Sequence, residues 1–112
     1  MPESTAYFRD LMNELNDLGI NEQHRLDRGF VHLAGVVNGK LLKIKLVTPT
    51  MLIPGETRQW DAATKASLKQ QQQAHIIAQL QSAGLRDSGG QSNAARVLAA
   101  LRAWADCPEQ ND

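Results

Sequence analysis

Cationic side chains in the middle of the chain are the residues whose type and spacing could do chemistry with a partner. Residues 29–69 hold six lysines and arginines against only Glu56 and Asp61, a local net charge of +4. Lysines are flexible point charges that suit contact with phosphate groups without reading bases. The competing interpretation is a solvated face whose lysines protect a strand edge from aggregation. We predict a local contact surface for DNA or RNA made of Lys40, Lys43, Lys45, His32, Arg58, Lys65 and Lys69.

Groups suited to catalysis or metal binding are scarce in this sequence. The three histidines, His24, His32 and His75, lie far apart without the short spacing of paired metal ligands, and a zinc site needs about four ligands. Cys107 is the only cysteine, which excludes an intrachain disulfide, and its place at a predicted helix C-terminus disfavours a reactive thiolate. The motifs of serine hydrolases, phosphate-binding loops and dinucleotide-binding proteins do not occur. We therefore expect no enzymatic activity, no metal and no cofactor.

Length and overall charge limit the strength of the predicted contact. The chain has 112 residues, which predicts a single domain, and its 12 basic and 12 acidic residues cancel. The positive middle is offset by a net charge of −3 over residues 1–28 and of −1 over residues 70–112. A strong nucleic-acid binder is usually basic overall, so we expect a local, weak contact. The sequence shows neither a membrane-length apolar run nor the start of a signal peptide, so a cytoplasmic protein without membrane contact is expected.

A β-hairpin is the clearest structural feature of the sequence and would position most of these cations. Two runs of β-prone residues, 30–37 and 40–47, flank Asn38-Gly39, the dipeptide that most strongly favours a two-residue type I′ turn. Counting outward from that turn pairs His32 with Lys45. Alternation then gives one apolar face, with Val31, Leu33, Leu42, Ile44 and Leu46, and one basic face, with His32, Ala34, Lys43 and Lys45 beside Phe30, Val36, Leu41 and Val47.

Three helices are predicted around the hairpin. Apolar residues at helical spacing predict helices at about 4–18, 60–83 and 93–106, the last with Ser92 as its N-cap. The second helix carries four consecutive glutamines, residues 70–73, and we expect this polar centre to project from the core or to bridge to a partner. Residues 48–59 are expected to form a loop, and the tail from about residue 107 to be frayed. The fold predicted is α+β in the order α-β-β-α-α, with residues 22–28 as an uncertain third strand.

Two local patterns have a functional and a structural interpretation. Residues 88–92, Ser-Gly-Gly-Gln-Ser, precede a helix N-terminus that could hold an anion, but a flexible linker ending in an N-cap explains them better. The last two helices could form a helix-turn-helix, yet residues 84–91 are about twice the usual turn of 3–4 residues. A packed helical pair is the better explanation.

One family resemblance follows from the order of these elements. A helix, a hairpin turned by Asn38-Gly39-Lys40 and a helix that opens with Lys65 and Lys69 resemble the double-stranded-RNA-binding domain over about residues 8–80. That family has the order α-β-β-β-α and lysines at the start of its last helix. The chain departs from it in two places. Ten residues between Gly19 and Phe30 are too few for the family's first strand and minor-groove loop, and residues 48–59 are longer than its short glycine-rich connection.

Two functions are compatible with these features. The first is a non-enzymatic accessory or regulatory protein whose basic hairpin face and second-helix start contact nucleic acid. The alternative is a protein–protein adaptor or inhibitor that acts as a homo-oligomer. It is favoured by the neutral isoelectric point near 6.8, by the glutamine-rich helix and by a two-stranded sheet that is too small to be stable by itself.

Overall fold

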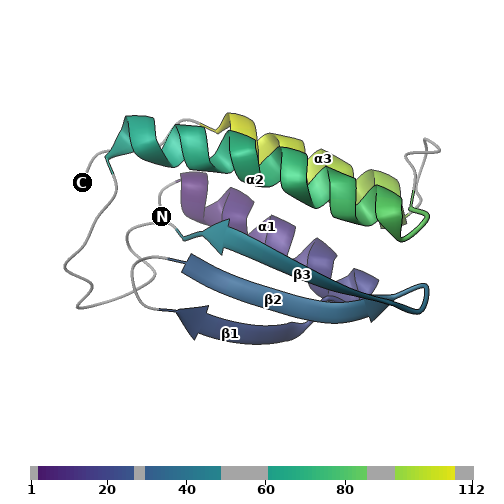
Figure 1. The fold of residues 1–112 in the computed structure, drawn as a ribbon. Coiled ribbons are helices and arrows are strands. Elements are labelled where there is room, and N and C mark those ends of the chain that lie inside the picture. Colours follow the sequence, from purple (N-terminus) through teal and green to yellow (C-terminus); the bar gives the residue numbers. More distant parts are fainter. Residues whose placement is uncertain (1–2, 27–29, 49–60, 86–92, 108–112) are drawn as a thin grey trace.

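The protein is a two-layer α+β structure with its helices on one face of a small antiparallel sheet (Figure 1). In a computed structural model, the described residues are 3–26, 30–48, 61–85 and 93–107. The elements are α1 (Glu3–Leu18), β1 (Glu22–Leu26), β2 (Phe30–Val37), β3 (Lys40–Val47), α2 (Ala62–Ser82) and α3 (Asn93–Asp106). The sheet order is β1-β2-β3. The predicted α+β class is confirmed. Among the described residues, no helix is both long and apolar enough to cross a lipid bilayer.

The hairpin of β2 and β3 forms with the predicted turn and register. Asn38 and Gly39 both have positive φ, 51° and 80°, as a type I′ turn requires. Lys45 pairs with His32, and the other cross-strand pairs follow from the same count. The Asn38 side-chain amide donates a hydrogen bond of 2.9 Å to the carbonyl oxygen of Ala83. This bond attaches the tip of the hairpin to the end of α2.

β1 is a third strand that the predicted order α-β-β-α-α leaves out. Its five residues, EQHRL, pair antiparallel with β2, so the observed order is α-β-β-β-α-α. The strand lies at the sheet edge and has little apolar alternation, which explains its weak signal. The chain reaches it from α1 through Gly19, whose φ is +115°. A side chain on Gly35 of β2 would collide with the Gly19 carbonyl oxygen, so Gly35 allows this close passage.

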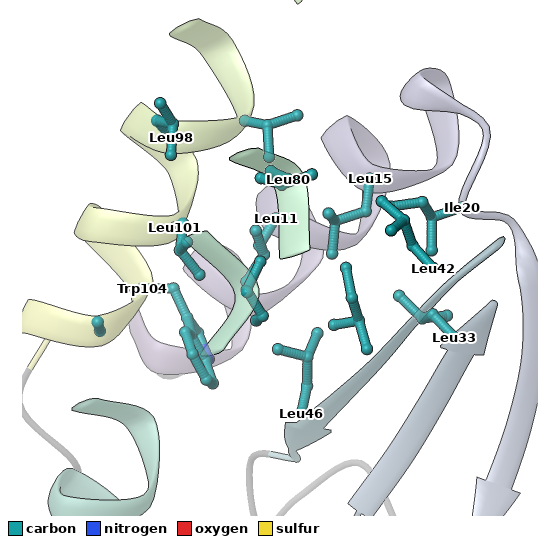
Figure 2. Packing of buried hydrophobic residues seen from close by; sticks show 14 of the residues in the cluster. Leu11, Leu15, Ile20, Leu33, Leu42, Leu46, Leu80, Leu98, Leu101 and Trp104 are labelled. Carbon is teal, nitrogen blue, oxygen red and sulfur yellow. The ribbon is translucent and has the colours of Figure 1, made fainter. Parts of the chain in front are cut away.

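The hydrophobic core lies between the sheet and the helices (Figure 2). The helix-facing side of the sheet contributes fully buried Leu33, Ile44 and Leu46. Leu11 and Leu15 of α1, together with Trp104 and Leu101 of α3, point toward Leu33 and Leu46 in Figure 2. α3 contacts both α1 and α2, and α2 contacts β3. Every helix is therefore used to cover the same face of the sheet.

The predicted helices form within a few residues of their expected bounds. α2 begins after Asp61, whose carboxylate accepts a hydrogen bond of 2.7 Å from the backbone amide of Thr64. This N-cap bond also lowers the pKa of Asp61. The proposed N-cap Ser92, the Gly-Gly segment, the loop after Thr48 and the tail beyond Cys107 lie outside the described residues.

Two glutamines of the run 70–73, Gln70 and Gln72, contact neighbouring elements instead of only projecting from the core, and Gln79 further along α2 does the same. The Oε1 atoms of Gln72 and Gln79 each accept a hydrogen bond of 3.0 Å from β3, from the backbone amides of Val47 and Lys43 respectively. Gln70 donates a 3.2 Å hydrogen bond to the carbonyl oxygen of Ala105 in α3. Amide side chains satisfy backbone groups that an edge strand otherwise leaves open. The polar centre of α2 therefore holds the helix against the sheet edge and against α3.

Candidate interaction surface

The face of the sheet turned away from the helices carries most of the predicted hairpin cations. Residues that pair across antiparallel strands share a face, so the register defines its members. We call the eight members nearest the hairpin turn the outer face: Glu22, His24, His32, Ala34, Val36, Leu41, Lys43 and Lys45. Phe30 and Val47 form the next row on the same side. Three rows run across the strands: Val36 and Leu41 (the apolar pair); Glu22, Ala34 and Lys43 (the charged row); and His24, His32 and Lys45 (the histidine row).

The apolar pair lies next to the hairpin turn and is open to solvent. Val36 is 62% exposed and Leu41 is 56% exposed. The end of this side farthest from the turn is not accessible to solvent, because Val47 is buried and Phe30 is partly buried against the core cluster. The accessible part of the outer face is therefore the apolar pair together with the charged and histidine rows.

The histidine row holds less positive charge than its composition indicates. Burial, the nearby Lys45 ammonium and His24 lower the pKa of His32, in that order of importance. The His32 Nε2 atom is buried and has no hydrogen-bond partner among the described residues. The Lys45 Nζ atom lies 4.1 Å from the centre of the Phe30 ring, a cation–π contact that holds the lysine over the sheet. His24 contacts the carboxylate of Glu22 at 3.2 Å.

The lysines at the start of α2 do not belong to the outer face. Lys65 is 4% exposed and Lys69 is fully buried. Lys69 Nζ donates a 2.8 Å hydrogen bond to the carbonyl oxygen of Cys107 and lies 5.5 Å from the centre of the Trp104 ring. Lys69 is therefore part of the packing between α2 and α3, and Lys65 is buried rather than exposed. Arg58 lies outside the described residues.

Lys40 completes the set of predicted contact residues. It is exposed, but it pairs with the buried Val37 and so belongs to the helix-facing side, at its end near the turn. The structure thus brings Lys43, Lys45 and His32 together on one face and leaves Lys40, Lys65 and Lys69 elsewhere. Sequence reasoning missed Glu22 and His24 as outer-face residues. Their spacing of two along β1 is the signal that could have identified them once that strand was accepted.

Two further hollows lie among the helices. A shallow groove of about 370 Å³ runs between α1 and α3, with Tyr7, Asp10 and three alanines of α3 in its lining. Within it, Arg96 and Glu14 form an ion pair of 3.0 Å. A smaller pocket of about 110 Å³ lies between α2 and α3 and is lined mainly by apolar side chains. No group of three potential metal ligands occurs within the described part of the chain.

Comparisons with known proteins do not place the chain in a family. A scan against protein-family models and searches of curated proteins and of solved structures found no match. The observed strand β1 gives the first five elements the order α-β-β-β-α, so the ten residues between Gly19 and Phe30 do hold a short strand. The resemblance to the double-stranded-RNA-binding domain nevertheless weakens at its lysines. Lys65 and Lys69 are buried and do not form an exposed cationic surface.

Proposed function

We propose that the protein is a non-enzymatic interaction protein that binds another protein with its outer face. The observation that carries this proposal is the apolar pair, in which Val36 and Leu41 are both more than half exposed on a face turned away from the helices. Contiguous exposed apolar side chains ringed by polar groups are typical of protein-binding sites. Here Lys43 and Glu22 supply the polar surroundings.

The electrostatics of the outer face also favour a protein partner. Its charged side chains are the two lysines and Glu22, so the face is mixed rather than uniformly basic. His32 adds little positive charge near neutral pH, because its pKa is lowered from 6.5. Lys45 is already engaged with the Phe30 ring. A mixed polar and apolar patch can be desolvated by a complementary protein surface at lower cost than a dense cluster of like charges.

A capture experiment with a matched variant tests this function. The purified full chain is immobilised on a resin and incubated with nuclease-treated extract of its native host. The bound proteins are then identified. We expect wild type and Gln81→Glu to retain the same partner, and Leu41→Glu to lose it. Gln81 is exposed on α2, so its variant adds the same charge away from the outer face. Identical capture by all three folded proteins would show that the outer face is not the binding surface.

Nucleic acid is the second candidate ligand, and exposed Lys43 and Lys45 on one strand favour it. With about two phosphate contacts, the logarithm of affinity should fall against the logarithm of salt with a slope of only about −2. Fluorescence anisotropy with labelled single-stranded and duplex DNA and RNA would measure this slope. Lys43→Glu should then abolish binding and Glu22→Lys should strengthen it. Absence of binding at about 50 mM salt would exclude this candidate.

A further inference from the structure

We propose that the protein bound by the outer face is a second copy of this chain, stacked face to face about a two-fold axis parallel to the strands. This inference rests on the proposed function, because it uses the same surface. It adds the identity of the partner and the orientation of the two sheets. The observation behind it is that the outer face is complementary to itself in charge.

The charged row is acidic at one edge of the sheet and basic at the other. Glu22 on β1 and Lys43 on β3 both align with Ala34 on β2, the central strand. A two-fold rotation about an axis along β2 exchanges the β1 and β3 edges but keeps each row at its own level. Glu22 of one copy then lies over Lys43 of the second copy, and the contact occurs twice. Stacked sheets lie about 10 Å apart with strand directions within about 30°, close enough for these long side chains to meet.

The centre of the outer face can be covered without burying a strong charge. Ala34 is small, and the lowered pKa of His32 leaves its imidazole uncharged near neutral pH. Both residues are on β2, so each lies next to its counterpart in the second copy. Val36 is on the same strand, and stacking places the two valines against each other. Val36 thereby loses solvent contact, and Leu41, whose row has no partner on β1, borders the same contact from β3. Burial of this apolar surface is the main favourable contribution to such an interface.

Association through the β3 edge is opposed by α2. An edge strand pairs with another chain through unpaired backbone groups. The amides of Lys43 and Val47 on β3 already donate hydrogen bonds to Gln79 and Gln72. The edge of β1 is the other route to sheet extension, and it does not depend on a contact between Glu22 and Lys43. Substitutions at Glu22 and Lys43 should therefore weaken the face-to-face dimer but not a dimer formed by pairing of two β1 edges.

The size of the outer face predicts a reversible dimer. Three strands spaced about 4.8 Å apart and three rows spaced about 6.7 Å apart define a surface on the order of 300 Å² per copy. Two copies then bury on the order of 600 Å² in total, well below the roughly 1,600 Å² of stable complexes, so only weak association is expected. Dimer formation should therefore be visible as a dependence on protein concentration rather than as a permanent assembly.

A charge-swap experiment tests the two-fold arrangement. Sedimentation equilibrium of the full chain is measured from low to high micromolar concentration for wild type, Glu22→Lys, Lys43→Glu and the double variant. Each single variant places like charges opposite each other twice, so we expect its dimer to weaken at least about tenfold, or about 1.4 kcal/mol. The double variant restores opposite charges and should recover the affinity of wild type to within a few-fold.

Lys40→Glu is the matched control, because it makes the same substitution on the helix-facing side of the hairpin. It should dimerise like wild type. Several outcomes would overturn the inference: a monomer at every concentration, assembly beyond the dimer, failure of the double variant to recover, or equal dimerisation of all variants as expected for the β1 edge. A monomeric wild type whose partner capture still depends on Leu41 would overturn the inference and leave the proposed function standing. A monomeric wild type whose partner capture does not depend on Leu41 would overturn both the inference and the proposed function.

Discussion

At the scale of single residues, Lys69 shows how a charged side chain can belong to a core. Its ammonium donates to the carbonyl oxygen of Cys107, directly after α3, and lies near the Trp104 ring. A cation at a helix C-terminus interacts favourably with the unpaired carbonyl groups there. The four-carbon stem meanwhile contributes apolar surface between α2 and α3. Lys69 therefore joins α2 to the C-terminal end of α3, 38 residues further along the chain.

Truncation of Lys69 should destabilise the fold. We expect Lys69→Ala to lower the free energy of unfolding by about 2–4 kcal/mol, because it removes a charged hydrogen bond and leaves a cavity. Lys69→Met keeps most of the volume and should cost less. Urea denaturation measures both changes. Lys40→Ala is the exposed control and should stay within about 0.5 kcal/mol of wild type. An equal effect of Lys69→Ala and Lys40→Ala would contradict the assigned role.

His32 should make stability depend on pH. Its pKa is lowered in the folded protein, so the unfolded chain binds the proton first as pH falls. Stability is complete above the unfolded value of 6.5 and is lost as pH falls from there toward the lowered pKa. The buried Nε2 atom has no acceptor among the described residues for a second N–H. The loss cannot exceed about 1.4 kcal/mol per pH unit for one group.

Urea titrations between about pH 5.5 and 7.5, on both sides of the ordinary histidine pKa, measure this dependence. His32→Gln should flatten the slope, because it removes the titrating group. His75→Gln removes an exposed histidine of α2 that contacts Gln79; it can change the absolute stability but should leave the slope with pH unchanged. The charged groups facing His32 across the sheet are Lys45 and His24, with Glu22 beside His24. An unchanged slope in His32→Gln would assign the pH dependence to another group.

At the scale of elements, α2 protects the sheet edge through side chains rather than through backbone pairing. Gln79 and Gln72 are seven residues apart, about two helical turns, and their β3 partners are four residues apart. Seven helical residues rise about 10.5 Å and four strand residues span about 13 Å. The two lengths are similar enough for both glutamine side chains to reach their strand partners. The spacing explains how a glutamine-rich segment reaches the strand edge at two points while Ile76, between the two glutamines, packs in the core.

Removal of these glutamines should open the β3 edge. The double variant Gln72→Ala, Gln79→Ala should lose about 1–3 kcal/mol of stability, since each amide it frees is left without its acceptor. The backbone amides of Lys43 and Val47 should exchange with deuterium faster than in wild type. Amide exchange followed by NMR resolves the two positions. Gln81→Ala provides the control on the same helix. Unchanged protection at both amides would show that the glutamines do not hold the edge.

The elements also show which features were predictable from sequence and why others were not. The hairpin register followed from Asn38-Gly39, because a turn with two positive φ angles leaves little freedom in pairing. The edge strand β1 lacked such a local determinant. The spacing of four between Lys65 and Lys69 puts both on one side of α2, but the tertiary fold decides that this side is buried. Lys69 and Lys65 precede buried Ile76 by seven and eleven residues, so all three lie on the same side of α2. The buried side of the helix therefore begins with two lysines, and an apolar pattern does not reveal it there.

At the scale of the whole molecule, the charge segregation along the chain becomes only in part a segregation between layers. Most of the acidic residues of the first segment lie on α1 and three lysines of the basic middle lie on the hairpin, but Glu22 lies on β1 and Lys65 and Lys69 lie on α2. Part of the acidic charge is used within the helical layer, where Glu14 pairs with Arg96 of α3. The zero net charge is therefore the sum of unequal charges on different elements, with acidic residues concentrated on α1 and lysines on the hairpin. The outer face is the side on which opposite charges remain at opposite edges.

The stability of the whole molecule should depend on its concentration if two copies stack through the outer face. Dimerisation that involves only folded chains raises the midpoint of thermal unfolding by mass action. For a domain of this size, the midpoint should rise by roughly 3 °C per tenfold increase in concentration once the dimer is populated. Differential scanning calorimetry of wild type and Lys43→Glu measures this. For the variant the rise should begin only at about tenfold higher concentration or above, because like charges face each other in its dimer. A constant midpoint for wild type would instead mean that folding is complete within one chain and that the outer face remains open to a different partner.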